Sequence, residues 1–191
     1  MTRADRLRFC HRTHEGDIMN YAGIKYCDIA NGLGCRTVLF VSGCRNACEG
    51  CFQPHTWDFN YGEEFDEEIQ QKVIDSLEPS YIKGLTLLGG EPFEPENQEA
   101  LVPFVKRVRQ AHPDKDIWCF TGYVYDKDLQ PGQRKYTQYT DELLSMIDIL
   151  VDGPFILAQK NIMLKFRGSE NQRVLDLKKT IETGEIVKYL D

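Results

Sequence analysis

Short apolar segments alternate with segments of helical periodicity along this chain, and this alternation restricts the fold more than any other feature. Segments rich in β-branched and aromatic residues are predicted to be strands, at Gly23–Ile29, Thr37–Val41, Leu85–Leu88, Ile117–Phe120 and Ile149–Val151. Strands that alternate with helices favour a parallel sheet with crossover helices. The sequence therefore predicts an α/β protein whose functional loops gather at the carboxyl ends of the strands.

Three helices are predicted between these strands. The first follows apolar residues that recur every four positions, namely Phe65, Ile69, Val73 and Leu77. Asn97 is predicted to cap a second helix that ends before Pro113, and Thr140 is predicted to cap a third.

The chain has 191 residues, of which 41% are hydrophobic and 28% are charged, as expected for a soluble globular protein. We expect a single domain over residues 19–191, preceded by a flexible polar extension over residues 1–18. The extension carries four arginines but no continuous apolar stretch, so it does not read as a secretory signal. A mitochondrial presequence is the alternative, and its acidic residues disfavour it. We expect a cytoplasmic protein.

Charge and hydropathy exclude two classes of partner. Thirty acidic residues against 23 basic ones give a net charge of −7, and no basic cluster is present, so nucleic acid is not an expected ligand. No apolar run approaches the roughly 18 residues that a membrane-spanning helix requires, so no membrane association is expected.

The seven cysteines are an odd number in a chain without an export signal, which favours reduced thiols over a disulfide framework. Cys27, Cys35 and Cys119 fall in or beside predicted strands and are expected to be buried packing thiols. Three further potential metal ligands in the extension, at Cys10, His11 and His14, are more simply read as solvated side chains.

The remaining cysteines, Cys44, Cys48 and Cys51, lie within eight residues directly after the strand at 37–41. Thiolates at this spacing can bind three corners of one iron–sulfur cube, whereas a structural zinc site needs four closed ligands. The fourth iron then keeps an open coordination position that suits substrate binding. The alternatives are three free thiols in a tight loop and a zinc site completed by His55.

A second motif, Gly89-Gly90-Glu91-Pro92, ends the next predicted strand. The two glycines leave space for a ligand against the backbone, and Glu91 is expected to accept a hydrogen bond from an ammonium group. A tight turn between strand and helix is the simpler interpretation of this motif alone.

The cysteine triplet followed by the Gly-Gly-Glu-Pro turn resembles the radical S-adenosylmethionine (SAM) superfamily. Further stretches in the same order narrow the resemblance: Asp28–Gly34, Leu39–Cys44, Ile117-Trp118 with Thr121–Tyr123, Val151–Gly153, and Arg167–Ser169 with Asn171-Gln172. Together, over residues 19–175, they resemble the activating proteins of anaerobic (class III) ribonucleotide reductases.

The resemblance implies a partial, open (β/α) barrel with a mainly parallel sheet. It implies one 4Fe-4S cluster held by Cys44, Cys48 and Cys51, whose open iron binds the amino and carboxylate groups of SAM.

The resemblance also assigns residues to the two ends of SAM. The methionine end would be held by Gly89, Gly90 and Glu91. Gly50, Cys51 and Phe52 would lie near the adenine. The superfamily usually has an aromatic residue immediately before the third cysteine, where this chain has Gly50, so either Phe52 or the backbone contacts the adenine.

Three further polar residues carry alternative interpretations. Thr121, at a strand end, is either a further SAM contact or a strand-terminal hydroxyl. Asp152, also at a strand end, either shapes the site, binds the partner or caps a turn. Arg167 either recognises a carboxylate or partner or forms a surface salt bridge.

The chemistry that the resemblance implies is one-electron cleavage of SAM to methionine and a 5′-deoxyadenosyl radical. That radical would abstract hydrogen from a glycine of the large subunit of an anaerobic ribonucleotide reductase. A flavodoxin or ferredoxin would supply the electron. The alternatives are an activase of another glycyl radical enzyme such as pyruvate formate-lyase, a radical enzyme acting on a small molecule, and a non-catalytic zinc-binding interaction module.

Overall fold

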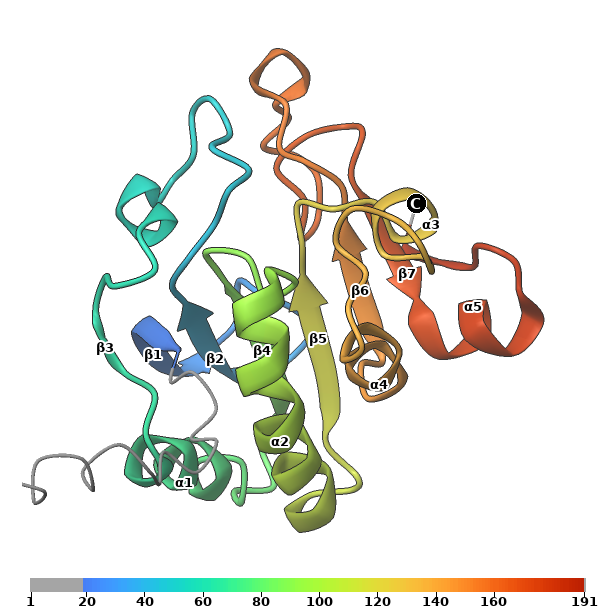
Figure 1. Ribbon diagram of the computed structural model, residues 1–191. Coiled ribbons are helices and arrows are strands. Elements are labelled where there is room, and N and C mark those ends of the chain that lie inside the picture. The colour runs from blue at the N-terminus through green and yellow to red at the C-terminus, as the bar shows by residue number, and fades with distance from the viewer. Residues whose placement is uncertain (1–18, 191) are drawn as a thin grey trace, which may run out of the picture.

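The computed structural model describes residues 19–190, which contain an eight-stranded sheet with helices packed against it (Figure 1). The strands are β1 (Asn20–Asp28), β2 (Cys35–Val41), β3 (Glu63–Glu64), β4 (Ile82–Gly89), β5 (Asp116–Phe120), β6 (Ile149–Asp152), β7 (Arg173–Asp176) and β8 (Lys188–Leu190). The helices are α1 (Glu67–Asp75), α2 (Pro95–Ala111), α3 (Tyr125–Asp128), α4 (Thr140–Ser145) and α5 (Leu177–Thr183), with short 3-10 turns at Pro54–Trp57 and Leu157–Gln159. The expected extension over residues 1–18 lies outside the described residues.

The sheet is open, with the strand order β3-β1-β2-β4-β5-β6-β7-β8. Its centre, β2-β4-β5-β6, is parallel, and the flanking strands are antiparallel. Val41 is in register with Gly89, and Phe120 with Val151, so the parallel strands end along one edge. The α/β class and the parallel centre of the sheet are therefore confirmed.

Side-chain alternation gives the sheet two different faces. Leu39, Leu87, Cys119 and Leu150 point to the face covered by α1, α2 and α4, where they belong to the main hydrophobic core. Their strand neighbours point to the opposite face. That face carries a smaller cluster around Trp118 and is otherwise open near the ends of the parallel strands.

All five predicted strands are present, as β1, β2, β4, β5 and β6. The first predicted helix is also present as α1, where the Asp66 side chain accepts a hydrogen bond from the Ile69 N–H at 2.8 Å. The short strands β3, β7 and β8 were not predicted, since none of them contains more than two consecutive apolar residues.

Two predicted helix caps were wrong. Helix α2 begins at Pro95 with Glu94 as the N-cap residue, and Asn97 lies inside the first turn. Pro95 starts the helix because the fixed φ of proline suits the first helical position. Thr140 is the first residue of α4 and Tyr139 is the N-cap residue, so this prediction misses by one position.

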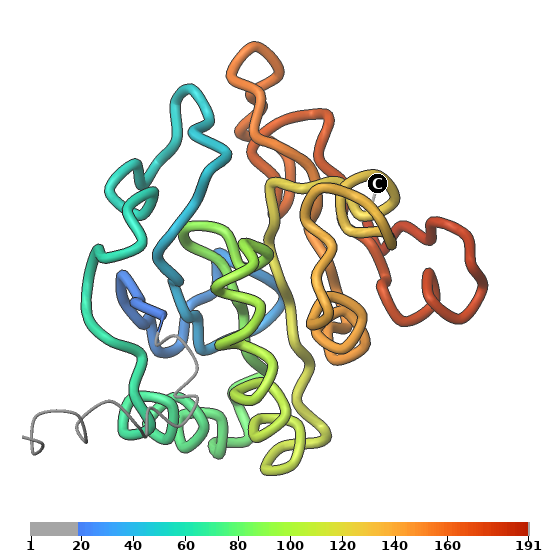
Figure 2. Tube along the Cα trace, in the orientation of Figure 1, coloured from blue at the N-terminus to red at the C-terminus, as the bar shows by residue number. Residues whose placement is uncertain are grey.

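Two long segments rise beyond the carboxyl ends of the parallel strands (Figure 2). One follows β2 and is drawn in cyan, and the other follows β6 and is drawn in orange. They lie on either side of the carboxyl ends of the parallel strands. The segment after β2 carries the cysteine triplet, which is therefore located at this end of the sheet. None of the helices among residues 19–190 is both long enough and apolar enough to cross a membrane.

The charged side chain of Arg36 is completely buried, and its guanidinium lies over the ring of Trp118, on the face of the sheet opposite the main core. Its guanidinium pairs with Asp116, donates to the Thr86 hydroxyl at 2.8 Å and donates to the Leu85 carbonyl at 2.8 Å. Burial lowers the pKa of Arg36, and the pairing with Asp116 opposes this shift. The side chain thus ties β2 to β4 and β5.

We predict that Arg36→Met lowers the free energy of unfolding by about 2–4 kcal/mol, because it leaves buried acceptors without their donor. Urea unfolding of the purified protein measures this. Lys106→Met removes a surface pair with Glu142 and should cost less than about 0.5 kcal/mol. Equal losses in the two variants would contradict this role for Arg36.

Candidate functional site

A cavity of about 600 Å³ lies on the open face, at the carboxyl ends of the parallel strands. Its floor consists of Phe40, Leu88, Phe120 and Val151, one residue from each of β2, β4, β5 and β6. Because these strands run in the same direction, the loops that follow them surround the cavity. This is where ligands commonly bind to open α/β sheets.

The three cysteines of the triplet all line this cavity and are all half-buried. Their loop leaves β2 at Val41 and is tied back to the next segment, since the Gly43 N–H donates to the Thr56 carbonyl at 2.8 Å. Burial raises the pKa of the Cys44 thiol to about 12 and also raises that of Cys48. The thiolate is the form that binds metal, so a bound cation would have to oppose these shifts.

The Gly89-Gly90 turn is packed against the start of the cysteine loop. A Cβ on Gly89 would lie 2.6 Å from the Val41 nitrogen, and one on Gly90 would lie 2.5 Å from the Gly43 carbonyl oxygen. Gly90 N–H donates to the Val41 carbonyl at 2.6 Å. The glycines are thus required for the close approach of two backbone segments, in addition to lining the cavity.

The Glu91 side chain is buried and accepts four hydrogen bonds from the protein itself. One oxygen accepts from the Thr121 hydroxyl (2.6 Å) and the Phe93 N–H (3.0 Å). The other accepts from the Gly122 N–H (2.7 Å) and the Asn46 amide (2.9 Å). A carboxylate offers about four acceptor sites, and donors of the protein itself occupy four here; the hydrogen bond expected from an ammonium group stays a prediction.

This arrangement gives Glu91 a structural task. Through Asn46 it fixes the cysteine loop, and through Thr121 and Gly122 it fixes the end of β5. Burial raises the pKa of Glu91 to about 7, and hydrogen bonds from Thr121, Phe93 and Gly122 act in the opposite direction.

A second buried carboxylate, Glu94, holds the cysteine loop at the neighbouring residue, Arg45. It accepts hydrogen bonds from the Arg45 N–H (2.9 Å), the Arg45 guanidinium (2.7 Å), the Tyr123 hydroxyl (2.7 Å) and the Lys135 ammonium (2.7 Å). Burial raises the pKa of Glu94, but the bonds from Lys135, Tyr123 and Arg45 outweigh this, and the pKa lies below its ordinary value. Since Arg45 follows Cys44 directly, Glu94 sets the position of that cysteine.

Comparison with known proteins now identifies the family. The model of the family described as 4Fe-4S single cluster domain matches residues 30–175. The anaerobic ribonucleoside-triphosphate reductase-activating protein of Haemophilus influenzae is 46% identical over 156 residues, which is 81% of this chain and 96% of the relative. The proteins of the same name from Enterobacteria phage T4 and Escherichia coli are 40% and 39% identical, over 82% and 84% of this chain and 93% and 100% of theirs.

The chain belongs to the family of anaerobic ribonucleoside-triphosphate reductase-activating proteins. It also contains the 4Fe-4S single cluster domain. The resemblance drawn from the short sequence motifs is thereby confirmed at the level of the family.

The residues around the cavity suit a cluster better than a single ion. Among residues 19–190, no group of three histidine, cysteine or acidic side chains is placed to hold one metal ion. In a cube, each cysteine binds a different iron, so the thiols must line one cavity without converging on one point. The triplet meets that condition. His55, the ligand in the zinc alternative, is absent from the cavity lining, and its ring stacks on Tyr61 with a centroid distance of 5.8 Å.

The residues expected near an adenine differ in exposure. The Phe52 ring lines the cavity but is 83% exposed, and the Lys160 ammonium lies 5.7 Å from its centroid. Gly50 has a φ of 77°, and a Cβ there would lie 3.0 Å from Leu157. Gly50 is not part of the cavity lining. Because it has no side chain, it allows Leu157, in the segment after β6, to lie close to the cysteine loop.

Two polar residues considered from the sequence have different surroundings. Asp152 is buried, accepts from the Tyr125 N–H at 2.8 Å and pairs with Arg173, so it holds the end of β6 together. Arg167 lines the cavity.

Sequence reasoning missed several of the residues that organise the site. Asn46 and Glu94 were not predicted, although Asn46 lies between Cys44 and Cys48 and Glu94 follows the Gly-Gly-Glu-Pro turn by two residues. Their positions next to the triplet and the Gly-Gly-Glu-Pro turn are the signal that could have indicated them.

Two of the three cysteines expected to be buried thiols are joined instead. Cys27 is exposed, Cys35 is half-buried, and a disulfide links them. They face each other because β1 and β2 form a hairpin, which the sequence pattern did not show. Cys119 is buried in the core, as predicted.

We predict that Glu94→Gln lowers the free energy of unfolding by about 1–3 kcal/mol, because Lys135 and Arg45 lose a buried anionic partner. Hydrogen exchange over residues 44–51 should also become faster. Urea unfolding and mass-detected exchange measure the two effects.

Glu96→Gln is the matched control, because Glu96 also pairs with Arg45 but is 43% exposed at its side chain. It should change stability by less than about 0.5 kcal/mol. If the two variants behave alike, Glu94 does not hold the loop.

Proposed function

We propose that this protein cleaves SAM reductively at a 4Fe-4S cluster and generates the glycyl radical of an anaerobic ribonucleotide reductase. The observation that carries the proposal is that three thiols from one loop line the same cavity as the ends of four parallel strands. The family supports the cluster and the role of activating protein. SAM, the ligand assignment and the radical step are our extension.

In this proposal Cys44, Cys48 and Cys51 bind three irons and leave the fourth open. Bound there, the cluster would supply the single electron for reductive cleavage of SAM to methionine and a 5′-deoxyadenosyl radical, which would take a hydrogen atom from the partner's glycine. The chain's own residues place these groups. Glu91 and Glu94 hold the cysteine loop at Asn46 and Arg45, directly after Cys44, and so tie this part of the loop to the strand ends.

The methionine end of SAM is assigned to Gly89, Gly90 and Glu91, which all line the cavity. Since the Glu91 carboxylate already accepts four hydrogen bonds, we assign its contact to the backbone of the turn. Thr121 also lines the cavity, and its hydroxyl donates to Glu91, so we assign it the role of holding the Gly-Gly-Glu turn in place beside SAM.

The adenine end is assigned to the segment Gly50–Phe52. Because the Phe52 ring is mostly exposed, we assign the contact to the backbone of this segment and to the edge of the cavity it forms.

The architecture supports this chemistry. We propose that the open sheet is a partial (β/α) barrel of the radical SAM type and that residues 19–191 form one domain. A parallel centre, crossover helices on one face and a cavity at the carboxyl ends of the strands are the features expected of such a barrel. The open edge leaves room for a glycine loop from a partner.

The proposed partners are the large subunit of the reductase and a low-potential donor such as flavodoxin or ferredoxin. We place the reaction in the cytoplasm, where free thiols and such donors occur. The names of the relatives favour the reductase over pyruvate formate-lyase.

We predict that Cys48→Ala abolishes SAM cleavage and most cluster binding, while the fold persists because the loop lies outside the core. Anaerobic reconstitution followed by metal and sulfide analysis should give about four iron and four sulfide per chain in the wild type. Cys119→Ala is the control and should keep its iron. One zinc per wild-type chain without sulfide, or SAM cleavage by Cys48→Ala, would reject the assignment.

We predict that the reduced protein and SAM generate a glycyl radical on an anaerobic ribonucleotide reductase and not on pyruvate formate-lyase. Electron paramagnetic resonance of anaerobic mixtures detects the radical. A signal on pyruvate formate-lyase alone would reject the proposed partner and leave the SAM chemistry standing.

A further inference from the structure

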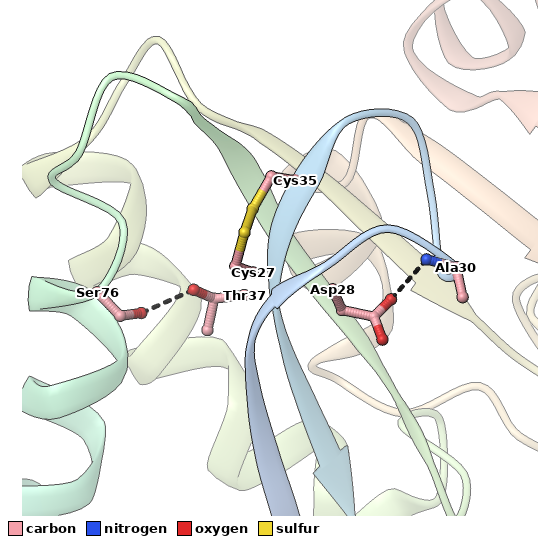
Figure 3. The surroundings of a disulfide bond; sticks show 6 residues. All are labelled: Cys27, Asp28, Ala30, Cys35, Thr37 and Ser76. Carbon is pink, nitrogen blue, oxygen red and sulfur yellow. Dashed lines mark hydrogen bonds between the residues drawn. A yellow bond between two sulfur atoms is a disulfide. The ribbon is translucent and has the colours of Figure 1, made fainter.

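The disulfide between Cys27 and Cys35 closes the neck of the loop that joins β1 to β2 (Figure 3). The two Cα atoms are 4.8 Å apart, and eight positions separate the residues in sequence. Within the loop, Ala30 and Asn31 line the cavity that contains the cysteine triplet. Ala30 and Asn31 lie only three and four positions after Cys27, so the redox state of the sulfur pair can affect one wall of the proposed SAM site.

We propose that Cys27 and Cys35 form a reversible redox site, reduced by dithiols and oxidised by disulfides such as glutathione disulfide. In the oxidised state the bond fixes the loop at residues 28–34 and with it one wall of the cavity. The effect on SAM rests on the proposed function, whereas the redox site itself does not.

The backbone at Cys27, where the loop begins, is held in an unfavourable conformation. Cys27 has a φ of 58°, in the left-handed region that side-chain-bearing residues rarely adopt. The pairing of β1 with β2 shifts register between Lys25 and Asp28, and this irregularity brings Cys27 to Cys35. The disulfide helps to hold Cys27 in this conformation, so reduction of the disulfide lets the backbone at Cys27 relax.

The inner part of the loop is held independently of sulfur. The Asp28 carboxylate accepts from the N–H groups of Ala30 (2.8 Å) and Asn31 (2.9 Å). The Thr86 hydroxyl donates to the Asn31 carbonyl at 2.8 Å, and Arg36 donates to the Leu33 carbonyl at 3.2 Å. Reduction should leave these hydrogen bonds in place, so that the loop keeps its fold and the cavity wall loosens only as far as they allow.

Exposure determines which sulfur reacts. Cys27 is exposed, so the thiolate of an external dithiol attacks its sulfur, breaks the bond to Cys35 and forms a mixed disulfide with Cys27. Cys35 leaves as a thiolate and takes up a proton. The second thiol of the reductant then displaces Cys27, which also becomes a thiol, and the reductant ends as a disulfide. Oxidation by glutathione disulfide reverses these two exchanges and releases two glutathione thiols.

The first test uses the full-length, cluster-reconstituted protein under anaerobic conditions. The protein is equilibrated in buffers of glutathione and glutathione disulfide, its free thiols are alkylated, and the peptides are analysed by mass spectrometry. We expect Cys27 and Cys35 to become protected together in one step as the buffer becomes more oxidising. A pair that stays reduced throughout, or stays oxidised in excess dithiothreitol, would overturn the proposal.

The second test measures the consequence for the loop. Hydrogen exchange over residues 27–35 should be slower in the oxidised protein, and SAM should bind about threefold more tightly because the wall is preorganised. Cys27→Ser and Cys35→Ser should behave like the reduced protein in both buffers and should keep the iron content of the wild type. Equal exchange in the two redox states would overturn the proposal.

The two tests separate this inference from the proposed function. Thiol trapping and hydrogen exchange require neither SAM nor a partner. If SAM binds in neither redox state, the proposed function fails, and the exchange result still decides whether the redox site controls the loop.

Discussion

The Glu91 carboxylate is the interaction on which the rest of the site depends. A buried carboxylate is costly unless its acceptor positions are filled, and here four donors fill them. The donors come from the cysteine loop, the start of the α2 segment and the end of β5. One side chain thus joins three segments that the chain brings together only at the open edge of the sheet. Glu94 repeats the principle beside Cys44, with cationic partners.

These carboxylates explain how a loop can carry the proposed chemistry. Loops are usually more mobile than the strands they follow, yet ligands for a cube must keep their relative positions. The structure meets this demand with hydrogen bonds from two buried carboxylates to Arg45 and Asn46, between the first two cysteines, and with the close backbone contact at Gly89 and Gly90. The hydrophobic core lies on the other face of the sheet, so the cavity face is left free for ligands.

The sequence predicted the parts of the protein that have a local signature. Strands such as Thr37–Val41 are short apolar runs between turn residues, and the triplet is a spacing that few sites share. The partners of buried polar groups have no such signature. Asn97 was assigned as a helix cap, but its amide donates to the carbonyls of Ser42 and Glu91, which only the folded chain brings near. The pairing of Cys27 with Cys35 likewise depends on a hairpin register that the pattern did not reveal.

The central claim is that one iron of the cube has no protein ligand and binds SAM. Mössbauer spectroscopy of the protein reconstituted with the iron-57 isotope tests this most directly, with and without SAM under anaerobic conditions. We expect SAM to change the isomer shift of a single iron site and to leave the other sites unaltered. Spectra that are identical with and without SAM would contradict the claim.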